Sequence, residues 1–227
     1  MHSRVFKALN AFLLCGLVST SHQAIAASIT LQYQGAAYGF ANGAIQADFN
    51  PIKNGLESKA VAAGGFDMLE TSTDQSLIAW CVDVFHSLNN QFEYAIGNPS
   101  SHNRFDDLQK LANQRYAQVT DKTTSAAFQL AIWEIVTDTG GGYSLANGTF
   151  KATGFGNAQA LAGEWLKLGG QNTGNYKISY FYDSILQDKN SSQNLITVSS
   201  VPLPGAALLM LSALGFGALL RRRQRTA

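Results

Sequence analysis

Cys81 is the residue whose type and setting most clearly allow chemistry. The sequence contains two cysteines, and the other, Cys15, lies in an N-terminal segment with the pattern of a removable export signal. Once that segment is removed, Cys81 has no partner for an internal disulfide. In an oxidising compartment an unpaired thiol is either buried and inert or used as a nucleophile, and the cysteine alone leaves both interpretations open.

A glutamine within an apolar segment is the second such residue. Gln129 lies in the run 126–135, which is apolar apart from this amide and Glu134 and which predicts a helix. Trp133 follows Gln129 by one helical turn, so the two side chains share a face. Taken separately, Gln129 is an ordinary helix residue and Trp133 an ordinary core residue.

The two segments together resemble the thioester domains of bacterial surface adhesins. The resemblance covers residues 75–137, where an aromatic residue and Cys81 lie on a predicted strand and Gln-x-x-Ile-Trp follows on a predicted helix. It implies that the thiolate of Cys81 attacks the side-chain carbonyl of Gln129, that ammonia leaves, and that an internal thioester remains. Phe128 departs from the family, which commonly has threonine at this place.

The resemblance also implies what surrounds the bond and what the bond does. Asp83 would support the site and Trp133 would cover the bond, while bulky neighbours including Trp80 and Phe128 would keep water from the activated ester. A target amine such as a lysine side chain would then take the acyl group. This would be a single-use cross-link rather than enzymatic turnover, and it needs no cofactor.

Two alternatives come from the residues themselves. A cysteine hydrolase would use Cys81 as nucleophile and His86 or His102 as base, but five residues along a strand place Cys81 and His86 on opposite faces. A noncatalytic matrix or surface protein would instead contact polysaccharide through exposed aromatic residues such as Tyr180 and Tyr182. No spacing of histidine, cysteine and carboxylate residues predicts a metal site.

Both ends of the chain predict export and sorting at a membrane. Residues 1–26 combine a basic start, an apolar stretch and the triplet Ala24-Ile25-Ala26, the pattern of a secretory signal that signal peptidase removes after Ala26. Residues 205–220 are uncharged and would form about 24 Å of helix, a marginal span for a hydrocarbon core of about 30 Å. A basic end follows and would stay in the cytoplasm; it consists of Arg221, Arg222, Arg223 and Arg225.

The C-terminal tail, residues 200–227, resembles the PEP-CTERM class of bacterial sorting signals. Its sorting motif consists of Val201, Pro202, Leu203 and Pro204, and Leu203 stands where the family usually has glutamate. The resemblance implies processing by a membrane-embedded exosortase in a Gram-negative bacterium that makes exopolysaccharide. The protein would be anchored in the inner membrane and then become periplasmic, surface-bound or part of the extracellular biofilm matrix. A plain membrane anchor is the alternative.

The charge of the central domain argues against nucleic acid as a partner. Six of the 16 basic residues lie in the terminal segments, which leaves ten basic residues against 15 acidic ones in the rest of the chain. A mildly acidic domain lacks the basic patch that binds phosphate backbones.

Residues 27–199 predict one α+β domain with a β-rich, sandwich-like body and an inserted segment of two to three helices. Hydrophobic patterns predict strands at 28–40, 76–85, 176–183 and 194–199. Helices are expected at 104–119, from a cap at Thr123 or Thr124 to the glycines at 140–142, and from a cap at Asn157 to 168. Glycines predict a loop-rich stretch over 35–65, and residues 189–193 a polar turn.

Overall fold

The structure is a computed structural model that describes residues 28–49, 55–97, 104–170, 174–183 and 191–201. The predicted export signal and the predicted membrane-spanning tail segment, with its basic end, lie outside these residues. Within the part of the chain that is described, no helix has the length and apolar character needed to cross a membrane.

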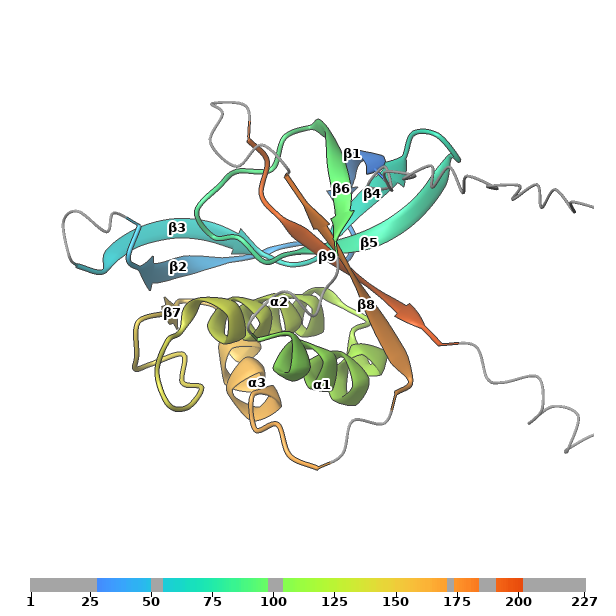
Figure 1. Cartoon of the computed structure of the whole chain (residues 1–227). Coiled ribbons are helices and arrows are strands. Elements are labelled where there is room, and N and C mark those ends of the chain that lie inside the picture. The colour runs from blue at the N-terminus through green and yellow to red at the C-terminus, as the bar shows by residue number, and fades with distance from the viewer. Residues whose placement is uncertain (1–27, 50–54, 98–103, 171–173, 184–190, 202–227) are drawn as a thin grey trace, which may run out of the picture.

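A closed barrel of six antiparallel strands forms one half of the domain (Figure 1). Its strands follow the order β1, β4, β5, β9, β8 and β6, and pairing of β6 with β1 closes it. The α+β class is confirmed, but the sandwich-like arrangement is wrong because the sheet closes on itself. The strand bounds are Ser28–Ala36 (β1), Phe66–Glu70 (β4), Gln75–Cys81 (β5), Gln91–Gly97 (β6), Tyr176–Tyr182 (β8) and Leu195–Ser200 (β9).

A separate three-stranded sheet occupies much of the stretch that the sequence predicted to be loops. It has the order β3-β2-β7, with β2 at Ala41–Ala47, β3 at Glu57–Ala63 and β7 at Lys151–Thr153. The prediction of loops was wrong because β2 and β3 are rich in alanine and β2 contains Gly43, and both residue types have low strand propensity. Gly43 shows why a glycine is needed inside β2, since the ring of Phe155 lies directly against its backbone.

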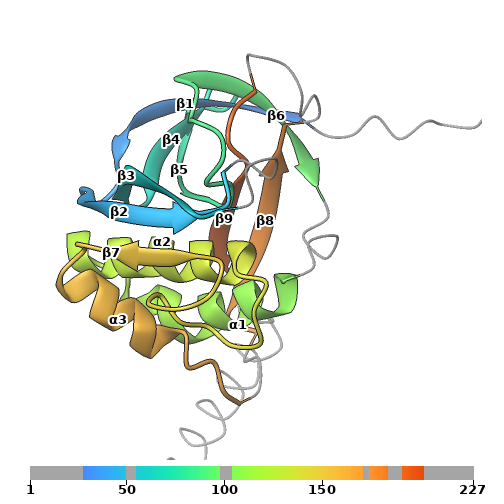
Figure 2. The same cartoon turned by 90° about the vertical axis from the view of Figure 1, so that its left-hand side faces the viewer.

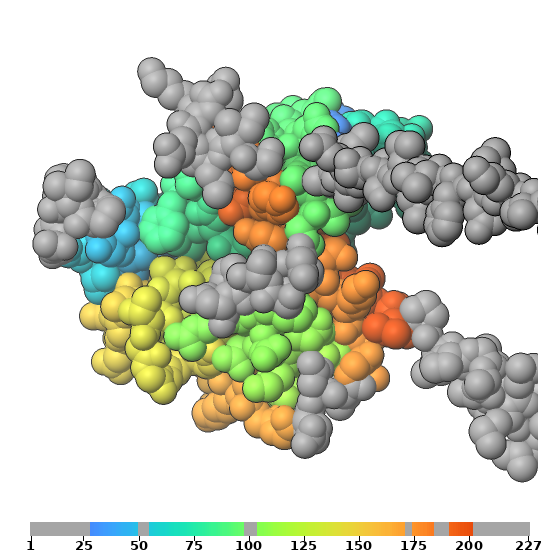
Figure 3. All heavy atoms as spheres, viewed as in Figure 1, coloured from blue at the N-terminus to red at the C-terminus, as the bar shows by residue number. Residues whose placement is uncertain are grey.

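Three α-helices form a layer beneath the barrel and the small sheet (Figure 2). They are α1 (Phe105–Arg115), α2 (Lys122–Thr137) and α3 (Asn157–Trp165), and a short 3-10 helix, η2 (Tyr116–Gln118), follows α1. The central helix α2 packs on β2, β3 and β5 on one side and on α1 and α3 on the other. Every α2 residue from Ser125 to Ile135 is therefore buried. Figure 3 shows the chain that follows α2, in yellow, packed below β2 and β3, in blue.

The helix ends differ in detail from the predicted ones. Asp121, rather than Thr123 or Thr124, is the N-cap of α2: its carboxylate accepts the backbone N–H of Thr124 at 2.8 Å, and the Thr124 hydroxyl accepts the backbone N–H of Asp121 at 3.0 Å. This reciprocal pairing is a capping box. The N-cap of α3 is Gly156, so Asn157 is its first helical residue.

The barrel and the layer beneath it have distinct apolar cores. Residues filling the barrel are Leu31, Met68, Ala79, Tyr94, Phe181 and Leu195. A larger core surrounds α2, and it includes Cys81 at the end of β5. The end of β5 and the buried helix are thereby packed in one core.

We expect Gly43→Ala to destabilise the fold by about 1–3 kcal/mol through overpacking. A Cβ at this position would lie 2.6 Å from the ring of Phe155 and 2.6 Å from the carbonyl oxygen of Thr153. Chemical denaturation measures the free energy of unfolding. Gly163→Ala is the matched control: nothing lies within 4 Å of the added Cβ in α3, and alanine should stabilise the helix by roughly 0.5–1 kcal/mol. Equal effects of the two variants would contradict the packing argument.

Candidate functional site

The side chain of Gln129 is hydrogen-bonded to the backbone of Cys81 at both ends of its amide. Gln129 Oε1 accepts the backbone N–H of Cys81 at 3.0 Å, and Gln129 Nε2 donates to the carbonyl oxygen of Cys81 at 2.7 Å. These two residues are 48 positions apart in the sequence and are joined where β5 ends above α2. The structure thus brings together the two residues singled out from the sequence.

Both residues of this pair are withdrawn from solvent. Cys81 is 1% exposed and Gln129 is 0% exposed. A buried amide is costly unless its donor and acceptor are satisfied, so the two hydrogen bonds fix the orientation of the Gln129 side chain. The amide carbon of Gln129 is held beside Cys81, in a place that water does not reach freely.

The thiol of Cys81 points to a different glutamine. Sγ lies 2.8 Å from Gln193 Oε1 and 3.1 Å from the backbone oxygen of Asp83, and the Asp83 N–H donates to the sulfur at 3.3 Å. The thiol has one proton, and the shorter contact makes Gln193 its acceptor. Burial raises the pKa of Cys81 to about 12, against smaller lowering effects from Trp133 and from the backbone of Asp83.

Gln193 was missed by the sequence analysis, which predicted only a polar turn there. The register explains its position: Cys81 pairs with Leu195 in antiparallel strands, and Val82 N donates to Asn194 O at 3.0 Å just beyond them. Continuing this register places Gln193 opposite Asp83. Gln193 is only 6% exposed, so the turn prediction was wrong for this residue.

The neighbour of Gln193 is also anchored inside the protein. Ser192 is 1% exposed, and its hydroxyl lies 2.8 Å from the Tyr94 hydroxyl and accepts the backbone N–H of Asn89 at 3.1 Å. Gln193 itself donates its backbone N–H to Ser87 O at 3.1 Å. These contacts hold the Gln193 amide next to the sulfur.

The aromatic residues predicted to shield the bond are part of the surrounding core. Trp80 and Phe128 pack edge to face with ring centroids 4.8 Å apart, and both are fully buried. Trp133 is 5% exposed and lies one turn after Gln129 on α2. The indole N–H of Trp133 has no hydrogen-bond partner within the described ranges.

Asp83 and His86 form a second polar pair near the thiol. His86 Nδ1 lies 2.6 Å from Asp83 Oδ2, and Asp83 Oδ1 accepts the backbone N–H of Phe85 at 2.9 Å. No hydrogen bond joins His86 to Cys81 in the described part of the structure. His102, the other histidine considered as a base, lies outside the described residues.

A cavity of about 210 Å³ connects these groups. Its polar lining comes from Cys81, Asp83, His86, Trp133 and Gln193, and its apolar wall comes largely from β2, β3 and β4. The cavity is lined both by the buried thiol and by the exposed His86, so it leads from the surface toward Cys81.

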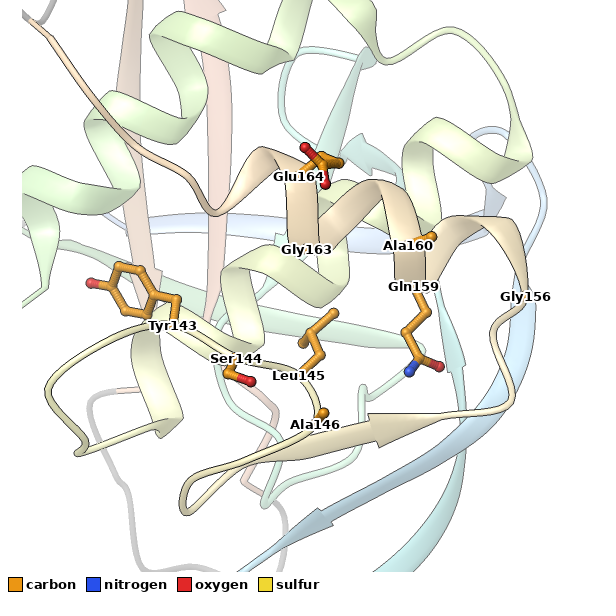
Figure 4. A pocket seen from close by; sticks show the side chains of 9 residues that line it. All are labelled: Tyr143, Ser144, Leu145, Ala146, Gly156, Gln159, Ala160, Gly163 and Glu164. Carbon is orange, nitrogen blue, oxygen red and sulfur yellow. The ribbon is translucent and has the colours of Figure 1, made fainter.

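Other parts of the molecule offer less chemistry. Tyr180 and Tyr182 stack with centroids 5.7 Å apart but are half-buried, so their predicted exposure was wrong. A wider hollow of about 550 Å³ lies between α3 and residues 143–146, lined by Tyr143, Leu145 and otherwise small or polar residues (Figure 4). Among the residues with described positions, no group of histidine, cysteine and carboxylate side chains could hold a metal ion.

A buried carboxyl group anchors the end of the helix that carries Gln129. Glu134 is 0% exposed, and its Oε1 accepts the backbone N–H of Ser144 at 2.6 Å. Burial, together with the charge of Asp138, raises the pKa of Glu134 to about 8. The protonated form of Glu134 is therefore favoured in the folded protein.

The chain was also compared with known proteins. It matches no protein-family model, no curated protein and no solved structure.

We expect Glu134→Gln to reduce the loss of stability on going from pH 5 to pH 8. The pKa of Glu134 is higher in the folded protein than in the unfolded chain. Its contribution to the free energy of unfolding is therefore complete below about pH 4.5 and is lost as the pH rises through about 8. Because glutamine does not ionise, the variant should lose about 1–3 kcal/mol less than wild type over this interval. Denaturant unfolding at each pH measures this, with the exposed Glu164→Gln as control. Parallel curves for wild type and Glu134→Gln would contradict the assignment.

Proposed function

We propose that Cys81 and Gln129 form an internal thioester through which this exported protein attaches covalently to amine-bearing targets. The observation that carries the proposal is the pairing of the Gln129 amide with the Cys81 backbone at 3.0 and 2.7 Å. A helix residue and a strand end 48 positions apart lie next to each other, and such proximity favours an intramolecular acyl transfer once the sulfur turns from Gln193 to Gln129.

The reaction joins the sulfur to the amide carbon and releases ammonia. Cys81 Sγ leaves its hydrogen bond to Gln193 and attacks Cδ of Gln129, the Cδ–Nε2 bond breaks, and the thiol proton ends on the departing nitrogen. Rotation of the Cys81 side chain about χ1 moves the sulfur between partners. The products are a thioester and one molecule of ammonia.

A donor for the developing negative charge is already in position. The backbone N–H of Cys81 donates to Gln129 Oε1 at 3.0 Å, and this oxygen becomes the oxyanion when the sulfur attacks. Fixed donors at such a position stabilise the transition state of acyl transfer. This favours Gln129 over Gln193 as the acyl partner, because the contact described at Gln193 Oε1 is with the thiol itself.

Burial supports a bond that persists until a target arrives. A thioester hydrolyses when water reaches it, and both Cys81 and Gln129 are almost fully buried. The same burial raises the pKa of the free thiol to about 12, so the unreacted cysteine is a weak nucleophile toward external reagents. The core around α2 therefore favours reaction within the chain.

The segments at the two ends of the chain support delivery of the protein to the cell surface. An export signal over 1–26 and the Val201-Pro202-Leu203-Pro204 tail would bring the domain through signal peptidase and exosortase to the cell surface or biofilm matrix. A thioester delivered there could meet amines on another cell, protein or exopolysaccharide. Adhesion is the role that this combination supports best.

We expect the freshly purified exported domain to be lighter than its sequence mass by one ammonia. Intact-mass measurement checks this, and Cys81→Ala or Gln129→Ala should each restore the mass calculated without ammonia loss. Methylamine should add to the wild-type protein and free the Cys81 thiol. Full mass in fresh wild-type protein would overturn the proposal and leave the noncatalytic surface protein as the interpretation.

Peptide mapping identifies which glutamine supplies the acyl group. Trypsin cleaves after lysine, so the two glutamines fall in different peptides. Gln129 lies in the peptide between Lys122 and Lys151, and Gln193 lies in the peptide that follows Lys189. Methylamine on the first peptide supports Gln129, and methylamine on the second assigns the bond to Gln193 instead. Gln114→Ala, which changes a partly exposed glutamine on α1, is the control and should keep the ammonia loss.

A further inference from the structure

The cavity beside Cys81 has polar groups that thioester formation does not use. The bond requires Cys81 and Gln129, of which Cys81 lines the cavity, whereas Asp83, His86 and Trp133 line it without being needed for the bond. Asp83 and His86 lie three residues apart, with side chains 10% and 38% exposed. One partner is thus fixed inside the protein and the other reaches toward solvent.

The contact with Asp83 determines which nitrogen of His86 is available. An ionised carboxylate only accepts hydrogen bonds, so the 2.6 Å contact makes Nδ1 the protonated nitrogen. Asp83 is itself fixed by the Phe85 N–H at 2.9 Å. When the ring carries no second proton, Nε2 of His86 is an acceptor, and no hydrogen bond within the described ranges occupies it. A histidine with this geometry can act as a general base.

An unpaired donor in the same cavity provides a second observation. The indole N–H of Trp133 has no hydrogen-bond partner among residues whose positions are described, although Trp133 is only 5% exposed. Buried donors are rarely left unpaired. Trp133 favours the thiolate form of Cys81, and a thiolate is the group that departs when an amine opens the thioester. The donor is thus suited to the second half of the reaction.

Two aromatic rings near the dyad suit a cationic amine, although neither is among the residues that line the cavity. Phe85 lies between Asp83 and His86 in the sequence, is 51% exposed, and packs against Phe49 with centroids 5.7 Å apart. The ammonium group of Lys59 already lies 3.8 Å from the centre of the Phe49 ring. Such rings attract ammonium groups through cation–π interaction.

We propose that Asp83 and His86 are a proton-accepting dyad that activates a primary amine in this cavity, with His86 as the catalytic base of acyl transfer. The proposal rests on the proposed thioester. It assigns the acceptor as a lysine-like aliphatic amine that arrives as ammonium and must lose protons before an amide can form.

The proton balance shows why a base is needed. An alkylammonium ion carries three protons on nitrogen and the secondary amide product carries one. As the N–C bond forms and the C–S bond breaks, one of the two released protons goes to the Cys81 sulfur. The other passes through His86 Nε2 to solvent. Gln129 is left as a substituted amide and Cys81 as a free thiol.

The test compares rates of amine addition in variants that still form the thioester. Intact-mass measurement first shows that each protein lacks one ammonia. The reaction with n-butylamine at neutral pH is then measured for wild type, His86→Gln and Asp83→Asn. We expect His86→Gln to react about 10²–10⁴-fold more slowly, the usual contribution of a general base. Ser87→Ala, an adjacent exposed position, should react at the wild-type rate.

Two further measurements separate base catalysis from altered shape. Hydroxylamine is largely neutral at this pH, so its reaction should be slowed less by His86→Gln than that of n-butylamine. Added imidazole should restore the reaction of His86→Ala with n-butylamine. Both results depend on proton transfer rather than on packing.

The outcomes distinguish the two proposals. If wild type shows no ammonia loss, the thioester and the dyad are both overturned. If wild type and His86→Gln both lose ammonia and add n-butylamine at equal rates, the dyad alone is overturned. If neither His86→Gln nor His86→Ala forms the thioester, His86 acts in formation of the bond. Its assignment as the base that activates the acceptor amine is then wrong.

Discussion

The pairing of the Gln129 amide with the Cys81 backbone determines the organisation of the site. An amide that is 0% exposed needs both of its hydrogen bonds, and the backbone of Cys81 at the buried end of β5 supplies them. These two hydrogen bonds connect α2 to the end of β5 and fix the distance and angle between the helix and the strand. The remaining contacts of the site, including those of the sulfur with Gln193 and Asp83, are arranged around this connection.

The central position of α2 follows from the same requirement. Because sheets lie on one side and helices on the other, α2 is buried all round from Ser125 to Ile135. Burial in this way requires that polar side chains on α2 form hydrogen bonds or carry no charge. Ser125 accepts the backbone N–H of Gly65 at 2.9 Å, and the pKa of the Glu134 carboxyl group is raised to about 8. A helix with so few exposed positions cannot shift without breaking these contacts, which gives Gln129 a rigid support.

The sequence predicted those parts of the fold whose side chains carry a pattern. A strand containing Cys81 and the helix around Gln129 were predicted because apolar runs and helical spacing are local signals. The predicted strand at 76–85 was too long, since β5 ends at Cys81. Gln193 was not, because it reaches the sulfur across 112 residues and only the barrel register places it there. β2 and β3 were missed because alanine and glycine carry little strand signal, although close packing requires small residues there. The barrel closure depends on the β1–β6 pairing, which no local pattern encodes.

The proposed thioester needs both protection from water and access for its target, and the size and lining of the cavity bear on both needs. A volume of about 210 Å³ is smaller than the 300–1,000 Å³ typical of sites for drug-sized ligands, so it suits a slender chain rather than a bulky group. Its apolar wall matches a methylene chain, and its polar end at Asp83 and His86 matches a charged tip. In the proposed reaction, an amine passes its charge to the dyad before it reaches the buried bond at Cys81. In this proposal, selection of the acceptor and exclusion of water arise from the same narrow, partly apolar space.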